Sequence, residues 1–377
     1  MLVLLLIFVQ MYRTMRLNVT YSLIFILGIA LHSCTSNTHN NINTGNSRID
    51  VDFSQTSDSL YLSTFVDSVE NKYLVLPDSL FIGEASQIYV DSAGIFIVDR
   101  KWKCIFHFDN NGHFVNKIDR LGEGPEEYLF ISNFWIWDKE LYIEDNRSEK
   151  INIYTSDGMY KRTIKCDGRF SDIAMVSDSS FLCFTPYFVY DNPVGVWEMD
   201  RDGKIKKEVI NYGEYPAVGL FWKYFYQTSD GKLGLFSPVT HSFMTYQNDT
   251  LITTLEINSV QPTIASFPGI SDGIMVKKEF YVPGWYIDGK NWLFSCYGRF
   301  REGEPSYLLY SKTDNEVYVY KNIIIDIGNA RVLGMPIHSN LPNGLVTLLS
   351  EDDLMGSNIS VDFKQGSSLL LQIYRMK

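Results

Sequence analysis

Short apolar segments alternate with turn signals along most of the chain. Two such stretches, residues 94–118 and 140–164, each read strand, turn, strand, and they align with each other without a gap. Asn-Gly at residues 111–112 and Asp-Gly at residues 157–158 separate apolar runs, which favours tight hairpins. A strand-rich repeat of roughly 50 residues is typical of a β-propeller, in which each repeat forms one blade.

The same pattern continues to the C-terminus and predicts six blades, each of four antiparallel strands. The last repeat lacks one strand, which the apolar segments Leu60–Val69 or Tyr73–Leu76 can supply. A strand from one terminus that completes the blade of the other closes the ring and removes an open sheet edge. We therefore predict an all-β, six-bladed β-propeller over residues 58–377, with the ring closed by an N-terminal strand. The alternatives are a pair of β-sandwiches, for which a domain linker is missing, and a β-solenoid, which the unequal repeat lengths disfavour.

The first 33 residues have the pattern of a signal peptide of the lipoprotein type. Arg16 precedes the apolar run Leu23–Leu31, which is too short for a membrane span of ~20 residues. The run leads to Leu31-His32-Ser33-Cys34, which resembles a bacterial lipobox, and this resemblance implies acylation of Cys34. Residues 34–57 begin with a Ser/Thr/Asn-rich stretch, so we expect a flexible tether. The expected location is the bacterial envelope, lipid-anchored at the outer membrane and facing the periplasm or the surface.

Charge excludes two classes of partner. The chain contains 44 Asp and Glu residues against 33 Lys and Arg, for a net charge of −11, and it has no basic cluster. An acidic body of this kind argues against nucleic acid and against anionic lipid surfaces. We therefore expect contact with a membrane through the lipid anchor only.

The remaining cysteines do not have the spacing of a metal site. They form no CxxC pair. Cys104 and Cys183 fall in strand patterns, where we expect them to pack as small buried side chains. We predict no metal site and no cofactor, with a calcium ion in the central channel as the alternative. The cysteines in question are Cys104, Cys166, Cys183 and Cys296.

The segment between the first two repeats, residues 120–128 (RLGEGPEEY), resembles a family signature. It is similar to the R-x-G-x-G-P-G-E-Y motif of the six-bladed β-propeller lipoproteins of Bacteroidota, within the NHL/TolB-like propeller group. Glu126 stands where the family has glycine. The resemblance covers roughly residues 59–377. It implies a propeller fold and an envelope location, and it implies no established activity.

This segment has two interpretations. In one, it lies at the mouth of the central channel, where Arg120, Glu123 and Glu126 contact a ligand. In the other, which we favour, it is a structural motif that locks two blades together, because glycine permits a tight backbone and proline fixes φ. The residues of this structural motif are Gly122, Gly124, Pro125, Glu127 and Tyr128.

Aromatic and ionisable side chains also fall on the predicted innermost strands. Trp135, Trp222 and Trp285 belong to aromatic-rich segments, whose rings stack on sugars or peptides in binding sites. The alternative for these tryptophans, which we favour, is packing between blades. The ionisable candidates on the same strands are Asp172, Lys223, Glu279 and His338.

The leading hypothesis is an envelope binding module that holds a glycan, peptide or protein partner at the channel mouth. The first alternative is a metal-dependent hydrolase or lactonase-like propeller enzyme. The second alternative is a purely structural envelope scaffold. Convergent carboxylates and histidines on the channel axis favour the enzyme, whereas an aromatic-lined mouth favours the binding module.

Overall fold

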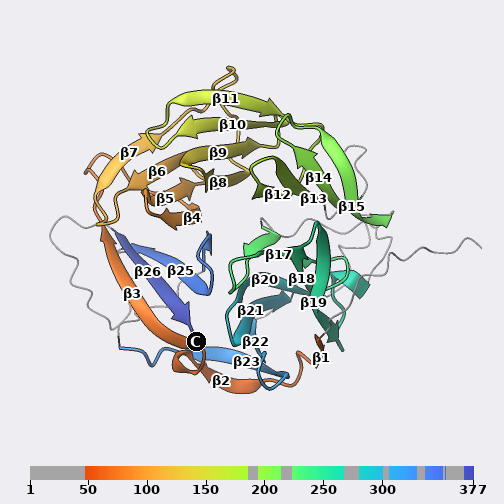
Figure 1. The fold of residues 1–377 in the computed structure, drawn as a ribbon. Coiled ribbons are helices and arrows are strands. Elements are labelled where there is room, and N and C mark those ends of the chain that lie inside the picture. The colour runs from red at the N-terminus through yellow and green to blue at the C-terminus, as the bar shows by residue number, and fades with distance from the viewer. Residues whose placement is uncertain are drawn as a thin grey trace, which may run out of the picture. The chain divides into compact units, whose positions relative to one another are not determined.

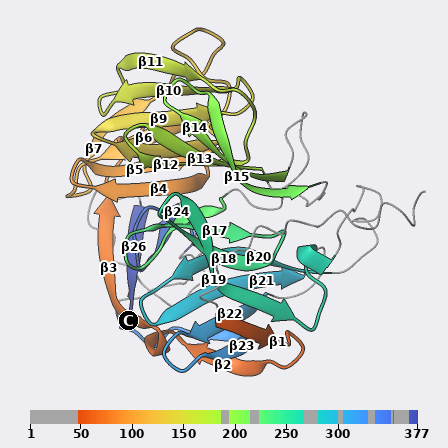
Figure 2. The same ribbon diagram turned by 45° about the vertical axis from the view of Figure 1, so that its right-hand side comes forward.

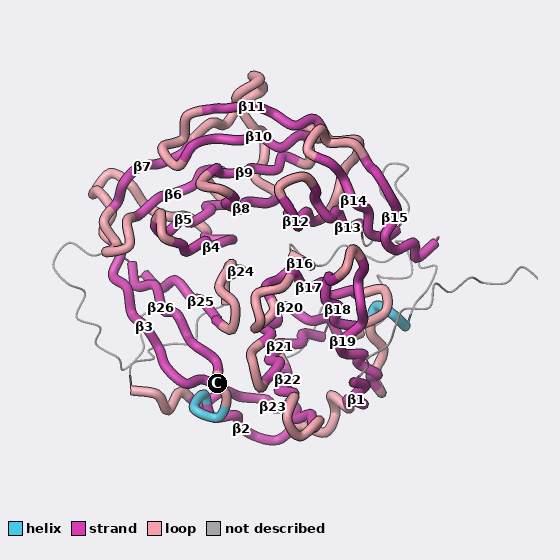
Figure 3. The backbone as a smooth tube through the Cα atoms, viewed as in Figure 1, coloured by secondary structure: helices cyan, strands magenta, loops and turns pink. Residues whose placement is uncertain are grey.

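The computed structural model describes residues 47–185, 194–213, 223–266, 280–299, 305–328, 336–350, 353 and 369–377. The chain divides into two units, Met1–Asn43 and Thr44–Lys377, and every described residue belongs to the second. The expected signal peptide and Cys34 lie outside the described residues. The second unit consists mainly of strands, with short 3-10 helices at η1 (Leu62–Thr64) and η2 (Ile264–Ser266) (Figure 3). No helix within the described ranges is long and apolar enough to cross a membrane.

The described strands form six sheets around a common centre, which confirms the predicted six-bladed β-propeller (Figures 1 and 2). Within each blade the consecutive strands are antiparallel. Blade one contains, from the centre outward, β4 (Ala85–Asp91), β5 (Gly94–Asp99), β6 (Cys104–Phe108) and β7 (Phe114–Ile118). Blade two contains β8 (Asn133–Trp137), β9 (Glu140–Asp145), β10 (Lys150–Thr155) and β11 (Tyr160–Lys165). Blade three contains β12 (Asp172–Ser177), β13 (Ser180–Thr185), β14 (Val194–Asp200) and β15 (Ile205–Gly213).

Blades four to six follow the same plan with different strand lengths. Blade four contains β16 (Phe225–Gln227), β17 (Leu233–Ser237), β18 (Ser242–Gln247) and β19 (Thr250–Ser259). Blade five contains β20 (Tyr281–Asp288), β21 (Trp292–Arg299), β22 (Ser306–Ser311) and β23 (Glu316–Ile324). Blade six contains β25 (Gly344–Ser350), β26 (Leu369–Met376) and the N-terminal strand β3 (Val66–Leu74).

The N-terminal segment supplies outer strands to three blades. β3 pairs with β26 of blade six, in the role that we predicted for a strand near residues 60–76. β1 (Ser47–Val51) runs parallel to β19 of blade four, and β2 (Ser57–Tyr61) runs parallel to β23 of blade five. β1 lies within residues 34–57, where a tether was expected. Its alternating side chains Ile49 and Val51 are buried in the core between blades four and five, so this part of the segment is a strand.

A short strand joins the last blade to the first. β24 (His338–Ser339) pairs in parallel with Gln87 and Ile88 of β4, and the preceding Ile337 bridges to Val346 of β25. Residues 329–335 lie outside the described part of the chain. The described portion therefore brings His338 to the inner edge of blade one.

The core lies between the blades. Every residue of β5 and β6 is buried, and tyrosine and phenylalanine rings fill the spaces between neighbouring sheets. Cys104 and Cys183 are buried, as predicted, and both are free; burial raises the pKa of the Cys104 thiol to about 12. Cys166 is also buried, whereas Cys296 is half-buried.

Candidate functional site

The innermost strands surround two cavities, of about 380 and 140 Å³. The two share part of their walls, and we refer to them together as the axial cavity. The larger cavity extends to β20 and to the loops before β4 and β8, and the smaller one extends to β8 and β12. The lining residues common to both are Gln87, Lys223, Tyr226, Gln227, His338 and Ser339.

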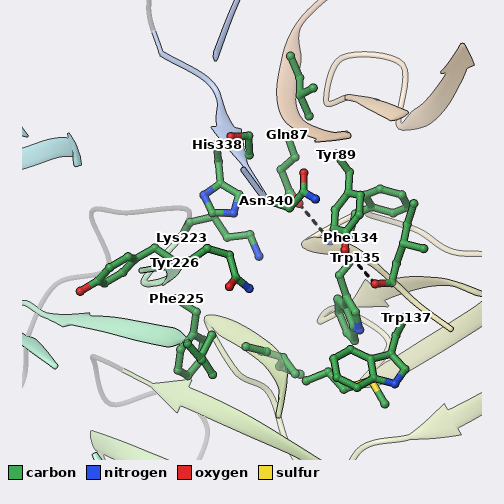
Figure 4. Close-up of a pocket in the computed structure, with 18 residues that line it drawn as sticks. Gln87, Tyr89, Phe134, Trp135, Trp137, Lys223, Phe225, Tyr226, His338 and Asn340 are labelled. Carbon is green, nitrogen blue, oxygen red and sulfur yellow. Dashed lines mark hydrogen bonds between the residues drawn. The ribbon is translucent and has the colours of Figure 1, made fainter. Parts of the chain in front are cut away.

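Aromatic side chains form much of the cavity wall (Figure 4). The Trp135 ring of β8 stacks on Tyr142 with ring centroids 5.4 Å apart, and its Nε1 atom is buried with no hydrogen-bond partner among the described residues. Trp137, on the same strand, donates from Nε1 to Asp178 Oδ1 at 2.7 Å. Trp285 of β20 lines the larger cavity. Two of the three candidate tryptophans, Trp135 and Trp285, therefore reach the axial cavity. Both also pack against core clusters between blades, which is the alternative that we favoured. The third, Trp222, lies outside the described residues.

Polar side chains also line the axial cavity. The amide of Gln87 donates to Ser132 O at 3.3 Å and accepts from Phe134 N at 3.2 Å, so its orientation is fixed. The His338 ring lies beside the Lys223 side chain (Figure 4), and within the described residues it has no hydrogen-bond partner. Burial, assisted by the charge of Lys223, lowers the pKa of His338 to about 3. The imidazole is therefore neutral at pH 7 and offers one donor and one acceptor.

Lys223 is held by a buried carboxylate. Its Nζ atom lies 3.0 Å from Asp172 Oδ1, and the Asp172 side chain is fully buried. The other carboxylate oxygen accepts hydrogen bonds from the backbone N–H groups of Tyr224 at 2.6 Å and Phe225 at 2.8 Å. Asp172 on β12 therefore fixes both the lysine and the backbone that leads into blade four.

A second buried acid lies behind this pair. Asn133 links the two, because its amide oxygen accepts from Lys223 Nζ and its amide nitrogen donates to Glu144. Glu144 is buried, and desolvation raises the pKa of its carboxyl group to about 8, against the opposing hydrogen bond from Asn133. Glu144 therefore holds a proton at neutral pH, and Lys223 is balanced by the single charge of Asp172.

The raised pKa of Glu144 gives a testable pH dependence. Between pH 4.5 and 8 the unfolded chain loses this proton while the folded chain keeps it, so stability falls as pH rises. We expect wild type to lose about 1.4 kcal/mol relative to Glu144→Gln between pH 5.5 and 6.5, measured by urea denaturation. Glu149→Gln, at a partly exposed ion pair with Arg169, should run parallel to wild type. Parallel curves for Glu144→Gln and wild type would show that Glu144 does not hold a proton in the folded protein.

The segment at residues 120–128 lies against the outer strands of blade two. Tyr154 Oη on β10 donates to Glu126 O at 2.8 Å, and Thr163 Oγ1 on β11 donates to Pro125 O at 3.3 Å. Arg120 Nη2 donates to Gly158 O at 3.2 Å, in the turn between these two strands. Arg120, Glu123 and Glu126 are exposed and do not line the axial cavity. A role for them in ligand binding stays a prediction.

Internal contacts explain the shape of this loop. Glu127 accepts from Gly124 N at 2.8 Å, and a Cβ atom on Gly122 would lie 2.0 Å from the same carboxylate. Tyr128 is fully buried, and its backbone pairs with both Arg120 and Gly122. The loop thus joins the outer strand of blade one to blade two.

The structure brings some of the predicted ionisable residues together. Lys223 and His338 share the axial cavity, Asp172 lies behind Lys223, and Glu279 lies outside the described residues. Gln87 and Glu144 were not singled out from the sequence, although a polar residue inside an apolar strand is a usable signal. Among the described residues, no group of three or more His, Cys, Asp or Glu side chains is placed to hold a metal ion.

Solved structures of Bacteroides proteins share this fold. A Bacteroides fragilis protein proposed to be exported is 16% identical with a TM-score of 0.66, over 88% of this chain and 99% of that one. A Bacteroides vulgatus member of the DUF4221 family is 14% identical with a TM-score of 0.52, over 83% of this chain and 98% of that one. No curated protein sequence matches the chain. With the six sheets, these structures confirm the expected relation to propeller proteins of Bacteroidota.

One family comparison covers most of the chain. Residues 46–373 match a family described as a domain of unknown function, DUF4934. The match begins just before β1 and ends within β26, so it includes the strands of all six described sheets. The chain therefore belongs to the DUF4934 family.

Proposed function

We propose that the protein is a binding module of the bacterial envelope that holds a carbohydrate in the axial cavity. The observation that supports this function is the composition of the cavity wall. Aromatic rings of Tyr226 and Trp285 line the same space as the polar groups of Gln87, Lys223 and His338. A sugar ring has apolar C–H faces and a rim of hydroxyl groups, so it suits a wall of this kind.

The charges of the wall favour a neutral polar ligand over a charged one. Lys223 pairs with Asp172, and Glu84 pairs with Arg100 across the larger cavity's rim. Asp288, the remaining carboxylate in the described wall, pairs with Lys312. Because each charge is already balanced, the wall offers hydrogen bonds without a net charge for an ionic ligand to neutralise.

His338 is suited to hydroxyl recognition. A neutral imidazole donates from one nitrogen and accepts at the other, and a hydroxyl group does both. Lys223 has three N–H donors, and the described contacts use two of them, to Asn133 and Asp172. Both side chains thus keep hydrogen-bonding capacity for a ligand in the cavity.

The envelope location rests on the N-terminal pattern. A signal peptide of residues 1–33, followed by an acylated Cys34, would deliver the chain to the cell envelope and attach it by a lipid. The similar Bacteroides fragilis protein is itself proposed to be exported, which supports the same destination. The first described strand begins at Ser47, so only a short stretch of sequence separates it from Cys34.

Trp285 provides the test of this function. Wild-type protein and a Trp285→Ala variant would be titrated with glucose, galactose, mannose and N-acetylglucosamine, and with their linear oligomers, by saturation-transfer NMR and calorimetry. We expect at least one series to bind wild type, and Trp285→Ala to weaken that binding about tenfold, because truncating a central aromatic contact costs more than about 1 kcal/mol.

The matched control is Trp292→Ala. Trp292 is half-buried on β21 and packs in the core between blades five and six, away from the cavity lining. The Trp292→Ala variant should therefore bind the sugars as tightly as wild type, provided that it is folded. Failure of wild type to bind any of the sugars would overturn the proposed function, and steady cleavage of a bound oligosaccharide would replace it with an enzymatic one.

A further inference from the structure

Two exposed aromatic side chains lie outside the axial cavity, on blade one. Phe81 is 60% exposed and Trp102 is 44% exposed, and their rings meet edge to face with centroids 5.5 Å apart. Phe81 belongs to the loop between β3 and β4, and Trp102 belongs to the loop between β5 and β6. Aromatic side chains left exposed to water are unfavourable. Adjacent exposed aromatic residues therefore often mark a surface that becomes covered when a ligand or partner binds.

A single buried carboxylate fixes both loops. Asp99 is fully buried at the end of β5. It accepts hydrogen bonds from the backbone N–H of Gly83, at 2.5 Å, in the first loop. It also accepts from the N–H groups of Lys101 at 2.9 Å and Trp102 at 3.0 Å in the second loop. The two aromatic side chains are therefore presented by a preorganised backbone.

These loops connect directly to the axial cavity. Glu84 and Arg100 line the larger cavity and form an ion pair with each other. Gly83 and Lys101 are the chain neighbours of this pair. The Trp102 ring packs closely on Gly83, because a Cβ atom there would lie 2.8 Å from Trp102 Nε1. The Glu84–Arg100 pair therefore lies between the larger cavity and the exposed ring of Trp102.

We propose that Trp102 and Phe81 form an outer subsite, which stacks sugar units of an oligosaccharide whose end occupies the axial cavity. This inference rests on the proposed function and adds that the ligand is a chain. Sugar rings stack on exposed aromatic rings, and their hydroxyl groups can bond to the Glu84–Arg100 pair between the two subsites. Lys101 Nζ lies 5.4 Å from the Trp102 ring centroid, which helps to orient the ring.

The test compares ligand lengths on one protein. The sugar series that binds wild type would be titrated as monosaccharide, disaccharide, trisaccharide and tetrasaccharide by calorimetry. We expect the affinity of wild type to rise about tenfold from the monosaccharide to the longer oligomers, as one further aromatic contact is engaged. Trp102→Ala should remove this increase and leave the affinity for the monosaccharide within about twofold of wild type.

Tyr318→Ala serves as the control, because Tyr318 is also exposed, on the outer strand β23 of blade five. It should retain the full dependence on length. A monosaccharide that binds while longer oligomers bind no better, or a Trp102→Ala variant that keeps the increase, would overturn the outer subsite and leave the cavity function intact. Absence of binding at every length would overturn both.

Discussion

Replacement of Asp172 with alanine should lower the free energy of unfolding by about 3–5 kcal/mol, because it removes one member of a buried ion pair. The variant leaves Lys223 in the wall of the axial cavity without its counter-charge. It also leaves the backbone N–H groups of Tyr224 and Phe225 without their acceptor, and both residues are buried. Water can reach Lys223 more easily than these N–H groups, so the backbone accounts for much of the loss.

The measurement is urea denaturation of the purified chain, followed by tryptophan fluorescence. Asp167→Ala is the matched control, because Asp167 pairs with Lys204 at 2.6 Å on the surface, with side chains 37% and 60% exposed. It should cost less than about 1 kcal/mol. A loss for Asp172→Ala as small as that of the control would mean that Asp172 does not anchor the start of blade four.

Asp172 also links stability to the proposed site. It holds Lys223 in the wall that the proposed ligand contacts, and the same carboxylate fixes the backbone before Tyr226. Lys223→Met would remove the charge of the lysine but leave the two backbone hydrogen bonds to Asp172 in place. It is therefore a weaker test of the role of Asp172 than Asp172→Ala. A binding defect in Asp172→Ala should be interpreted only under conditions in which the variant is folded.

The blades could be predicted because their signals are local. Strand, turn and strand in blade one follow from two short apolar segments and from Gly112 between them, whose φ of +90° is available to glycine at little cost. Each blade has its own strand and turn pattern within about 50 residues. A mistake in the strands of one blade therefore does not change the predicted number of blades.

The outer strands and the site depend on contacts distant in sequence. β1 is a short strand of mixed polarity, and it pairs with residues 255–259 in a register that no local pattern specifies. The contact of Lys223 with Asn133 and Asp172 likewise joins three blades. The sequence shows which residue types are present. It does not show that they converge on one cavity, because that depends on how the blades close into a ring.

Trp285 and Trp102 show most clearly which features of the site the sequence alone does not predict. An aromatic residue on a predicted innermost strand has the same sequence pattern whether it fills the core or faces a cavity. Trp285 packs against the core between blades and also lines the larger cavity. Trp102 follows a strand within a charged loop, and nothing local shows that Phe81 lies beside it.

Glycines at positive φ also join neighbouring blades. Gly112, Gly158 and Gly203 occupy the turns before the outermost strands of blades one, two and three. Each faces the outer strand of the preceding blade: a Cβ atom would lie 2.1 Å from Tyr73 O at Gly112, 3.0 Å from an Ile118 side-chain carbon at Gly158, and 1.9 Å from Lys165 O at Gly203. At Gly112 and Gly203 the neighbouring backbone is closer than any Cβ atom allows, whereas Gly158 lies in tight contact with a side chain.

Gly203→Ala should therefore destabilise the protein by about 2–5 kcal/mol, the sum of a left-handed backbone cost and a steric clash. At Gly203, φ is +82°, and its carbonyl oxygen also accepts from Asp167 N at 2.8 Å, so the turn cannot move away without losing a hydrogen bond. Gly231→Ala separates the two costs, because φ is +79° there and a Cβ atom would meet nothing within 4 Å. It should lose only about 1–2 kcal/mol in the same urea titration. Equal losses for the two variants would show that close approach between blades two and three does not require glycine, whereas a larger loss at Gly203 assigns the difference to the contact between blades.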